Sequence, residues 1–178
     1  MSIIVRPEEI TDLIQVRDLL YTTWLATYPN TDAGITEEDI HEFYKPRLTE
    51  EWHKKVVARF HEAHPNEHSF VAEIDGKIVG FMRIVLHPDK NQLQSIYVLP
   101  EYQRMGIGKL LWNKALSIFD GAKETIVQVA TYNANAIHAY KKLGFTDTGK
   151  RFSDERFKMK SGNLIPEMEM SIPPNTLG

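Results

Sequence analysis

The segment from Ile96 to Leu111 constrains the fold more than any other part of this sequence. It begins with the strand-like residues Ile96-Tyr97-Val98, which Leu99-Pro100 ends, and continues into a helix whose first turn carries Gly106 and Gly108. The first N–H groups of a helix have no partner within the helix, and the helix dipole is positive at that end. Because glycine has no side chain, a phosphate group can approach this backbone closely. The segment therefore predicts a strand, a loop and a helix that together bind a diphosphate.

Two common phosphate-binding patterns do not fit this segment. A Walker loop needs glycine at position 103 and serine or threonine at position 110, but the sequence has Gln103 and Leu110. The dinucleotide fingerprint needs a small residue at position 111, where the sequence has Leu111. A nucleotide-dependent enzyme is therefore disfavoured. A second interpretation, in which the glycines only shape the turn between strand and helix, stays open at this point.

The order of hydrophobic patterns along the chain predicts a mixed α/β fold. In the first third, Pro7 followed by two glutamates favours a helix start, and Thr36-Glu37-Glu38-Asp39 resembles a capping box at the start of a second helix. Thr49 is expected to cap a third helix that ends at Phe60. Later in the chain, Asp75-Gly76 lies between two apolar runs, which is the signature of a β-hairpin.

Composition limits the classes of protein to which the chain can belong. Its 178 residues fit a single domain, with residues 1–172 folded and residues 173–178 as a frayed tail. The formal net charge of −3 argues against a nucleic-acid partner. No apolar run approaches the ~18 residues that span a membrane, and the N-terminus lacks the apolar stretch of a signal peptide. The sequence therefore predicts a soluble, cytoplasmic protein with no membrane or nucleic-acid partner.

Two blocks of sequence resemble the GNAT superfamily of N-acetyltransferases. The first block, Gln103-x-x-Gly106-x-Gly108, is similar to the acetyl-CoA loop of that family, whose pattern is Arg/Gln-x-x-Gly-x-Gly/Ala. The second, over residues 133–145, is similar to the family segment Asn-x-x-Ala-Ile-x-x-Tyr-x-x-x-Gly-Phe. The resemblance covers residues 70–172. It implies a GNAT-like, mostly antiparallel central sheet flanked by helices. Residues 69–172 would form the acetyl-CoA-binding core, and residues 1–68 a strand and helices on the acceptor side.

The resemblance also implies roles for individual residues. The backbone of Ile96, Tyr97 and Val98 is expected to pair with the pantetheine arm of CoA, as an added strand would. Asn133 matches the asparagine that caps its helix and contacts the CoA arm, and Tyr140 matches the tyrosine near the CoA sulfur. The backbone N–H groups from Arg104 to Lys109 are expected to hold the diphosphate, in a loop that comprises Gln103, Arg104, Met105, Gly106, Ile107, Gly108 and Lys109.

Acyl transfer to an amine needs an oxyanion stabiliser, an acid and a base. A backbone N–H near Val98 can stabilise the tetrahedral oxyanion, and Tyr140 can protonate the departing thiolate. An alkylamine has a pKa of about 10 and must lose a proton before it attacks. Many family members carry a glutamate at the position of Gln94, and glutamine cannot accept that proton. The base therefore stays unassigned, with open alternatives at Glu73, Asp32, Glu37 and Glu38.

The remaining candidates concern the acceptor and metals. Aromatic residues are frequent in the first third of the chain, and for Trp24 and Tyr28 both a core position and a substrate contact stay open. Four histidines cluster without a carboxylate at a fixed spacing, so they are interpreted as part of a solvated loop and no metal is expected. These histidines are His53, His61, His64 and His68.

The predicted function is transfer of acetyl from acetyl-CoA directly to a primary amine of a small molecule, a polyamine or a protein N-terminus. Because the chain has no cysteine, an acetyl-cysteine intermediate is impossible, which favours direct attack by the amine. The alternative is a non-catalytic acyl-CoA-binding regulatory module on the same fold. Gln94 favours that alternative and Tyr140 opposes it. Exposed strand edges are compatible with a homodimer.

Overall fold

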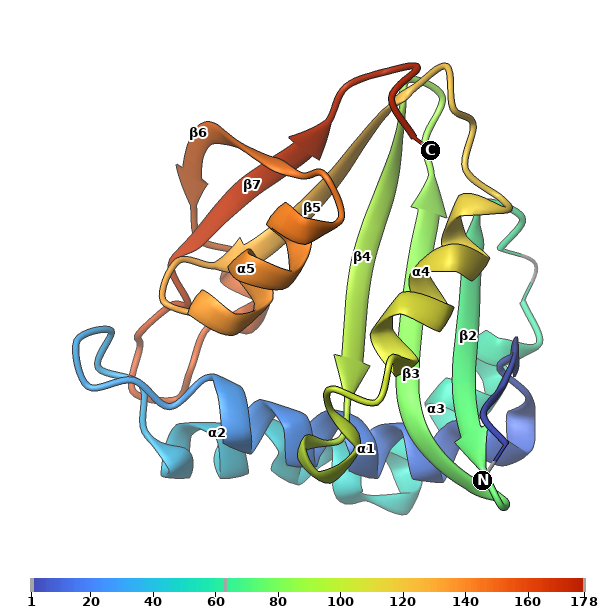
Figure 1. Cartoon of the computed structure of the whole chain (residues 1–178). Helices are drawn as coiled ribbons and strands as arrows, with labels where there is room; N and C mark the ends of the chain where they lie inside the picture. Colours follow the sequence, from blue (N-terminus) through green and yellow to red (C-terminus); the bar gives the residue numbers. More distant parts are fainter. Residues whose placement is uncertain (1, 63, 178) are drawn as a thin grey trace.

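A computed structural model describes residues 2–62 and 64–177, and it contains a seven-stranded sheet with helices on both faces (Figure 1). The helices are α1 (Leu13–Thr27), α2 (Glu37–Tyr44), α3 (Glu50–Phe60), α4 (Ile107–Leu116) and α5 (Ala134–Lys142). The strands are β1 (Ile4–Pro7), β2 (Glu67–Ile74), β3 (Lys77–Leu86), β4 (Lys90–Val98), β5 (Glu124–Ala130), β6 (Thr146–Phe152) and β7 (Glu167–Ile172).

The strands lie in the order β1-β2-β3-β4-β5-β7-β6 across the sheet. Within the described residues, β4 and β5 form the one parallel pair, and every other pair of neighbours is antiparallel. This arrangement confirms the predicted mixed fold with a mostly antiparallel sheet.

The two faces of the sheet are covered by different helices. On one face, α4 and α5 contribute Leu111, Trp112 and Tyr140 to the largest buried cluster, and Figure 1 shows both helices in front of the sheet. On the other face, α1 contributes Trp24 and α2 contributes Ile40 to a second, aromatic-rich cluster, and Leu19 of α1 belongs to a third cluster. The sheet therefore separates a face with the predicted CoA-binding helices from a face with the predicted acceptor helices.

Local sequence signals predicted several element boundaries correctly. The Asp75-Gly76 turn joins β2 to β3, and both residues have positive φ, 49° and 82°, as a type I′ turn requires. Thr36 and Asp39 form the predicted capping box of α2: the Thr36 side chain accepts a hydrogen bond from the Asp39 N–H at 3.1 Å, and the Asp39 carboxylate accepts one from the Thr36 N–H at 3.0 Å. Thr49 caps α3, which ends at Phe60 as expected.

The first α-helix begins later than Pro7 and its two following glutamates predict. Pro7 is the last residue of β1, where it pairs with Phe70, and α1 begins at Leu13 after a short 3₁₀ turn at Ile10–Asp12. The expected helix start at Pro7 is therefore wrong. Edge-strand pairing keeps Pro7 extended, since a proline at a strand end gives up no ladder hydrogen bond.

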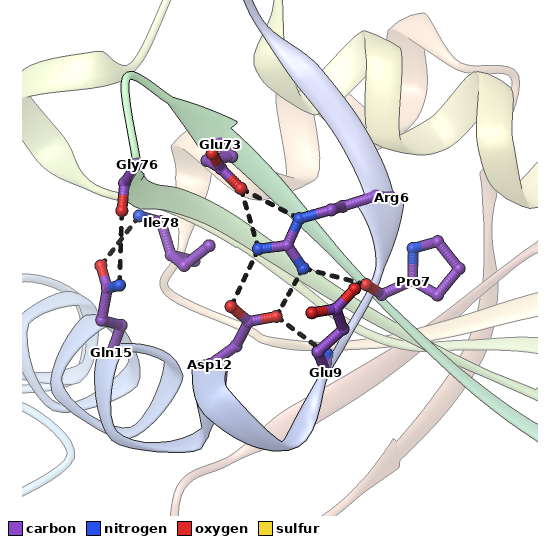
Figure 2. A network of polar contacts seen from close by, with 8 residues as sticks. All are labelled: Arg6, Pro7, Glu9, Asp12, Gln15, Glu73, Gly76 and Ile78. Atoms are coloured by element: carbon purple, nitrogen blue, oxygen red, sulfur yellow. Dashed lines mark hydrogen bonds and ion pairs between the residues drawn. The ribbon is translucent and has the colours of Figure 1, made fainter.

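An ion-pair network fixes where this first helix begins (Figure 2). The Arg6 guanidinium donates to both carboxylate oxygens of Asp12, at 2.6 and 2.9 Å, and to Glu73 of β2 at 2.9 Å. Hydrogen bonding to Arg6 holds the pKa of Asp12 below its ordinary value, against the opposing effect of burial. Gln15 extends the contact, because its side-chain oxygen accepts from the Ile78 N–H at 3.0 Å. The network therefore ties α1 to β1, β2 and β3 at one edge of the sheet.

The C-terminal segment, for which a frayed tail was expected, contacts the domain through one backbone group and one side chain. The Asn175 N–H donates to the Gly121 carbonyl at 2.7 Å, and Leu177 packs against the cluster under α4. With Trp112 and Leu143, Leu177 lines a cavity of about 330 Å³. The apolar side chain and the backbone hydrogen bond dock residues 173–177 on the domain, whereas Gly178 lies outside the described residues.

Candidate active site

The parallel strands β4 and β5 pair over only part of their length. Their register joins Lys90–Leu93 to Glu124–Val127, and the described residues show no pairing between the two strands beyond that point. Figure 1 shows β4 and β5 side by side at one end and diverging toward the other. The strand pair therefore opens into a gap, which we call the β4–β5 gap, bounded by Gln94–Val98 on β4 and Gln128–Ala130 on β5.

Backbone groups of β4 face the β4–β5 gap. The Leu99 N–H donates to the Val79 carbonyl on the β3 side at 3.0 Å, so the alternation of a strand turns the N–H of Val98 toward the gap. The Val98 carbonyl accepts a hydrogen bond from the Gln103 side chain at 3.1 Å. The predicted motif residue Gln103 thus fixes the end of β4, while the N–H of Val98 stays directed to the gap.

A register shift lies on β4 at Gln94, the position at which many members of the resembled family carry a glutamate. Ile84 of β3 pairs with Leu93, and the preceding Arg83 pairs with Ser95, so Gln94 is the extra residue of a β-bulge. Gln94 is exposed. The bulge therefore lies at the first of the β4 residues that border the gap.

The glycine loop lies at the start of α4. Gly106 has φ of 83°, the left-handed conformation that glycine adopts without strain, and it forms the N-cap of the helix. A Cβ built on Gly106 or Gly108 would meet no atom within 4 Å, so the space above the loop is open. The first-turn N–H groups of Ile107, Gly108 and Lys109 have no partner within the helix. Ile107 is itself buried, whereas Arg104 and Met105 are exposed beside the loop.

A second glycine brings this helix close to the sheet. A Cβ on Gly80 of β3 would lie 2.9 Å from a methyl group of Ile107 and 3.2 Å from one of Leu111. The first distance is shorter than real Cβ contacts, so any other residue at this position would force Ile107 to shift. Gly80 therefore helps to hold the loop next to the end of β4.

Helix α5 places Asn133 and Tyr140 on the other side of the gap. The Asn133 side chain accepts a hydrogen bond from the Ala136 N–H at 3.1 Å, which confirms its expected position as N-cap. Tyr140 is buried and packs edge to face on Phe145, with ring centroids 5.7 Å apart. Its hydroxyl forms no hydrogen bond within the described part of the chain. Burial raises the pKa of Tyr140, and the nearby Tyr97 raises it further, so the phenol stays protonated.

Aromatic residues line the gap on the face of the sheet that α1 and α2 cover. The hydroxyls of Tyr28 and Tyr97 share a hydrogen bond of 2.8 Å, and the Tyr132 hydroxyl donates to the Tyr28 carbonyl at 2.8 Å. Trp24 is buried and stacks on Phe43 at 5.0 Å, which is a packing position, whereas Tyr28 is half-buried. Of the two residues predicted to contact an acceptor, Tyr28 therefore lies with Tyr97 of β4, and Trp24 lies behind it in the aromatic cluster.

A carboxylate that the sequence did not single out lies on the same face. Glu167 is the first residue of β7, where it pairs with Ala130 of β5. Burial raises the pKa of Glu167 to about 7, with a further contribution from the charge of Asp154 and an opposing one from Arg156. In the sequence, Glu167 and Glu169 alternate with methionines, which indicates that both carboxylates lie on one face of a strand. The pattern does not indicate which face lies near the gap.

The carboxylates considered from the sequence lie elsewhere. Glu73 is paired with Arg6 in the network at the sheet edge, two strands from β4. Asp32, Glu37 and Glu38 are exposed between α1 and the first turn of α2. The charge of Glu167, in contrast, raises the pKa of Tyr28, Tyr97 and Tyr132.

The described residues show neither a metal-binding cluster nor a membrane-spanning helix. Within residues 2–62 and 64–177, no group of three or more histidine, aspartate and glutamate side chains is placed to hold a metal ion. In the same part of the chain, no helix combines the length and the apolar character that crossing a bilayer requires.

Comparison with known proteins defines the family. Residues 37–145 match the model of the acetyltransferase (GNAT) family, so this chain belongs to that family and the resemblance seen in the sequence is confirmed. The chain is 36% identical over 93 residues to an N-alpha-acetyltransferase of Sulfurisphaera tokodaii, covering 44% of this chain and 56% of that protein. It is 28% identical over 148 residues to a spermidine N(1)-acetyltransferase of Thermoplasma acidophilum, covering 82% of this chain and 89% of that protein.

The fold has a close counterpart among solved structures. PaiA N-acetyltransferase of Thermoplasma acidophilum, crystallised in complex with coenzyme A, aligns with a TM-score of 0.70 and 24% identity, over 94% of this chain and 98% of that one. This likeness supports the fold. The chain spans little more than half the length of the first sequence relative above.

Proposed function

We propose that this chain transfers acetyl from acetyl-CoA to a primary amine by direct attack of the amine on the thioester. The observation that carries the proposal is the β4–β5 gap, which has the open glycine loop on one side and a protonated, buried Tyr140 on the other. The β4–β5 gap is thus bordered by three kinds of group. The helix N–H groups can hold a diphosphate, the β4 edge can pair with an amide arm, and Tyr140 can protonate a thiolate. Such a set fits a CoA thioester.

Each part of acetyl-CoA has a proposed partner. The first-turn N–H groups of α4, from Ile107 to Lys109, would hold the diphosphate, and the exposed side chains Arg104 and Met105 would lie beside it. The free edge of β4 at Ile96 and Val98 would pair with the pantetheine amides. The side-chain oxygen of Asn133 is used by its own helix cap, so its amide N–H₂ is what remains for the CoA arm.

The acyl-transfer step follows from these positions. The Val98 N–H, directed to the gap, would donate to the oxyanion that forms when the amine attacks the carbonyl carbon. A donor of this kind contributes about 10²–10³ in rate. As the C–S bond breaks, the Tyr140 hydroxyl would give its proton to the CoA thiolate. Because the chain has no cysteine, no acyl group can pass through a protein thiol.

The acceptor class follows from the tyrosine-lined side of the gap. A cationic primary amine suits half-buried aromatic faces and a nearby carboxylate. Relatives that carry the names N-alpha-acetyltransferase and spermidine N(1)-acetyltransferase represent two such acceptors, a protein N-terminus and a polyamine. A homodimer and a cytoplasmic location stay predictions of the sequence.

The test is release of CoA thiol against a panel of amines. The panel contains spermidine, a short alkylamine, a peptide with a free N-terminal alanine, and the same peptide with a blocked N-terminus as control. The absence of cysteine means that a thiol reagent reads only CoA. The proposal predicts thiol release that depends on at least one free amine. Binding of acetyl-CoA without amine-dependent release would contradict it and favour an acyl-CoA-binding regulatory module.

A further inference from the structure

Glu167 lies on the acceptor face of the sheet. Met168, Met170 and Ile172 of β7 belong to the buried cluster that contains Tyr140 and Trp112. Because successive side chains of a strand point to opposite faces, Glu167 projects to the face covered by α1 and α2. Its neighbour across the strand pair, Ala130, belongs to the aromatic cluster with Trp24 and Tyr97, which is the same face.

Glu167 has no ion-pair partner among the described residues, whereas Glu169 on the same strand has one. Glu169, on the same strand and face, is buried and forms an ion pair with Lys150 at 2.7 Å. Glu167 is half-buried and makes neither an ion pair nor a side-chain hydrogen bond to any described residue. Arg156, the cation near it, is already paired with Asp154 at 2.5 Å. Burial of a carboxylate without a protein partner costs free energy, and the Glu167 oxygens stay free to accept a hydrogen bond or a proton from a ligand.

The groups around Glu167 come from four elements. Tyr28 at the end of α1, Tyr97 of β4 and Tyr132 after β5 each have a pKa that the charge of Glu167 raises. Asp154 and Arg156, in the segment between β6 and β7, act on Glu167 with opposite signs. Tyr97 in turn raises the pKa of Tyr140. Tyr97, which lies on β4 beside the gap, is therefore within electrostatic reach of both Glu167 and Tyr140.

We propose that Glu167 accepts the proton that the acceptor ammonium must lose before it attacks acetyl-CoA, either directly or through one water. The inference rests on the proposed acetyl transfer and adds to it the base that Gln94 cannot supply. Three observations support this role. Glu167 has no protein partner, it lies on the acceptor face, and Tyr28 and Tyr97 lie near it.

The proton and electron balance of the step is complete. The ammonium gives one proton to the Glu167 carboxylate, and the freed nitrogen lone pair forms the C–N bond at the thioester carbonyl. When the C–S bond breaks, the thiolate takes the Tyr140 proton, and the nitrogen of the tetrahedral intermediate returns a proton to the Tyr140 phenolate. The products are the acetylated amine and CoA thiol, and the proton on Glu167 leaves to solvent.

A pair of matched variants tests this role. Glu167→Gln keeps size and polarity but cannot accept a proton, and Glu169→Gln changes the ion-paired carboxylate on the same strand face. We expect Glu167→Gln to lower kcat/KM for a cationic amine by about 10²-fold or more. We expect the wild type to show an ascending limb of kcat/KM near pH 7, where the raised pKa of Glu167 lies, and Glu167→Gln to lose it. Glu169→Gln should keep that limb.

Comparing a neutral with a cationic acceptor amine distinguishes a catalytic role of Glu167 from a purely structural one. Trifluoroethylamine is already neutral at the assay pH, so its acetylation needs no base, and Glu167→Gln should lose little activity toward it. Acetyl-CoA affinity, measured by calorimetry, should be unchanged in Glu167→Gln. An equal loss with the neutral and the cationic amine, or an ascending limb that persists in the variant, would overturn the role of Glu167 while leaving the acetyltransferase activity standing.

A titration of the carboxyl groups tests the same role without any activity measurement. With ¹³C-labelled glutamate carboxyls, the resonance that disappears in Glu167→Asp identifies Glu167, and we expect it to titrate near pH 7. Titration in the ordinary glutamate range, about 4.3, would overturn the inference. Failure of the wild type to release CoA with any amine would instead contradict the proposed function, and with it a base for that reaction.

Discussion

Removing the Tyr140 hydroxyl isolates one step of the proposed chemistry. In the structure this hydroxyl has no hydrogen-bond partner among the described residues, so Tyr140→Phe leaves no protein group unpaired, and we expect a stability change below about 1 kcal/mol. The ring keeps its edge-to-face contact with Phe145. Loss of a general acid lowers the rate of the chemical step by about 10²–10⁴-fold, equivalent to about 3–5 kcal/mol in the barrier.

Rapid-quench single turnovers with acetyl-CoA and a saturating amine measure this step, and calorimetry measures acetyl-CoA binding. We expect the single-turnover rate to fall by that factor while the Kd for acetyl-CoA stays within about twofold. Tyr102→Phe is the control, because it removes a phenol hydroxyl from a ring that packs against Lys77, at 4.9 Å, on the side of the β2–β3 hairpin. A Tyr140→Phe rate equal to that of the wild type, with chemistry rate-limiting, would refute the assignment of Tyr140 as the acid.

Three further changes have defined outcomes. Gly106→Glu should abolish acetyl-CoA binding in calorimetry, since it fills the open loop with a negative side chain, and its positive φ should cost about 1–2 kcal/mol in a urea titration; retained binding would argue against the diphosphate cradle. Asn133→Ala should cost about 1 kcal/mol of stability through the lost cap, and a neutral result would show that the cap contributes nothing. Asp12→Asn, which weakens the Arg6 pairing, should cost about 1–3 kcal/mol at neutral pH. Because Arg6 lowers the pKa of folded Asp12, its stabilisation is complete above the unfolded value of about 3.9 and is lost as the pH falls through the folded value. Urea midpoints that fall equally with acid in wild type and Asp12→Asn would contradict that origin.

Signals confined to a few neighbouring residues were readable from the sequence. The Asp75-Gly76 turn, the Thr36–Asp39 capping box and the Asn133 cap each depend on backbone conformation and hydrogen bonds within four residues. The glycine loop at Gly106 belongs to the same class, because it needs a positive φ and the absence of a side chain. Such requirements leave a clear residue pattern.

The features that fail to show in the sequence depend on contacts between distant segments. Pro7 reads as a helix start, but pairing with Phe70 and the Arg6–Asp12 contact keep it in a strand. In the sequence, Glu167 resembles any other carboxylate on a strand. It becomes a candidate base only because β7 pairs with β5 and brings it near Tyr28 and Tyr97. The opening of β4 from β5 likewise follows from where their pairing stops, which no local pattern records.

The most direct test of direct acetyl transfer is the stoichiometry of a single reaction with a free amine. Free CoA thiol is measured with a thiol reagent, and the acetylated amine in the same sample is measured by mass spectrometry, with protein that contains no cysteine of its own. Direct transfer predicts that the two products form one to one, and that no thiol appears when the amine is blocked or omitted. Thiol release that proceeds equally without amine, or the absence of any acetylated amine, would contradict it.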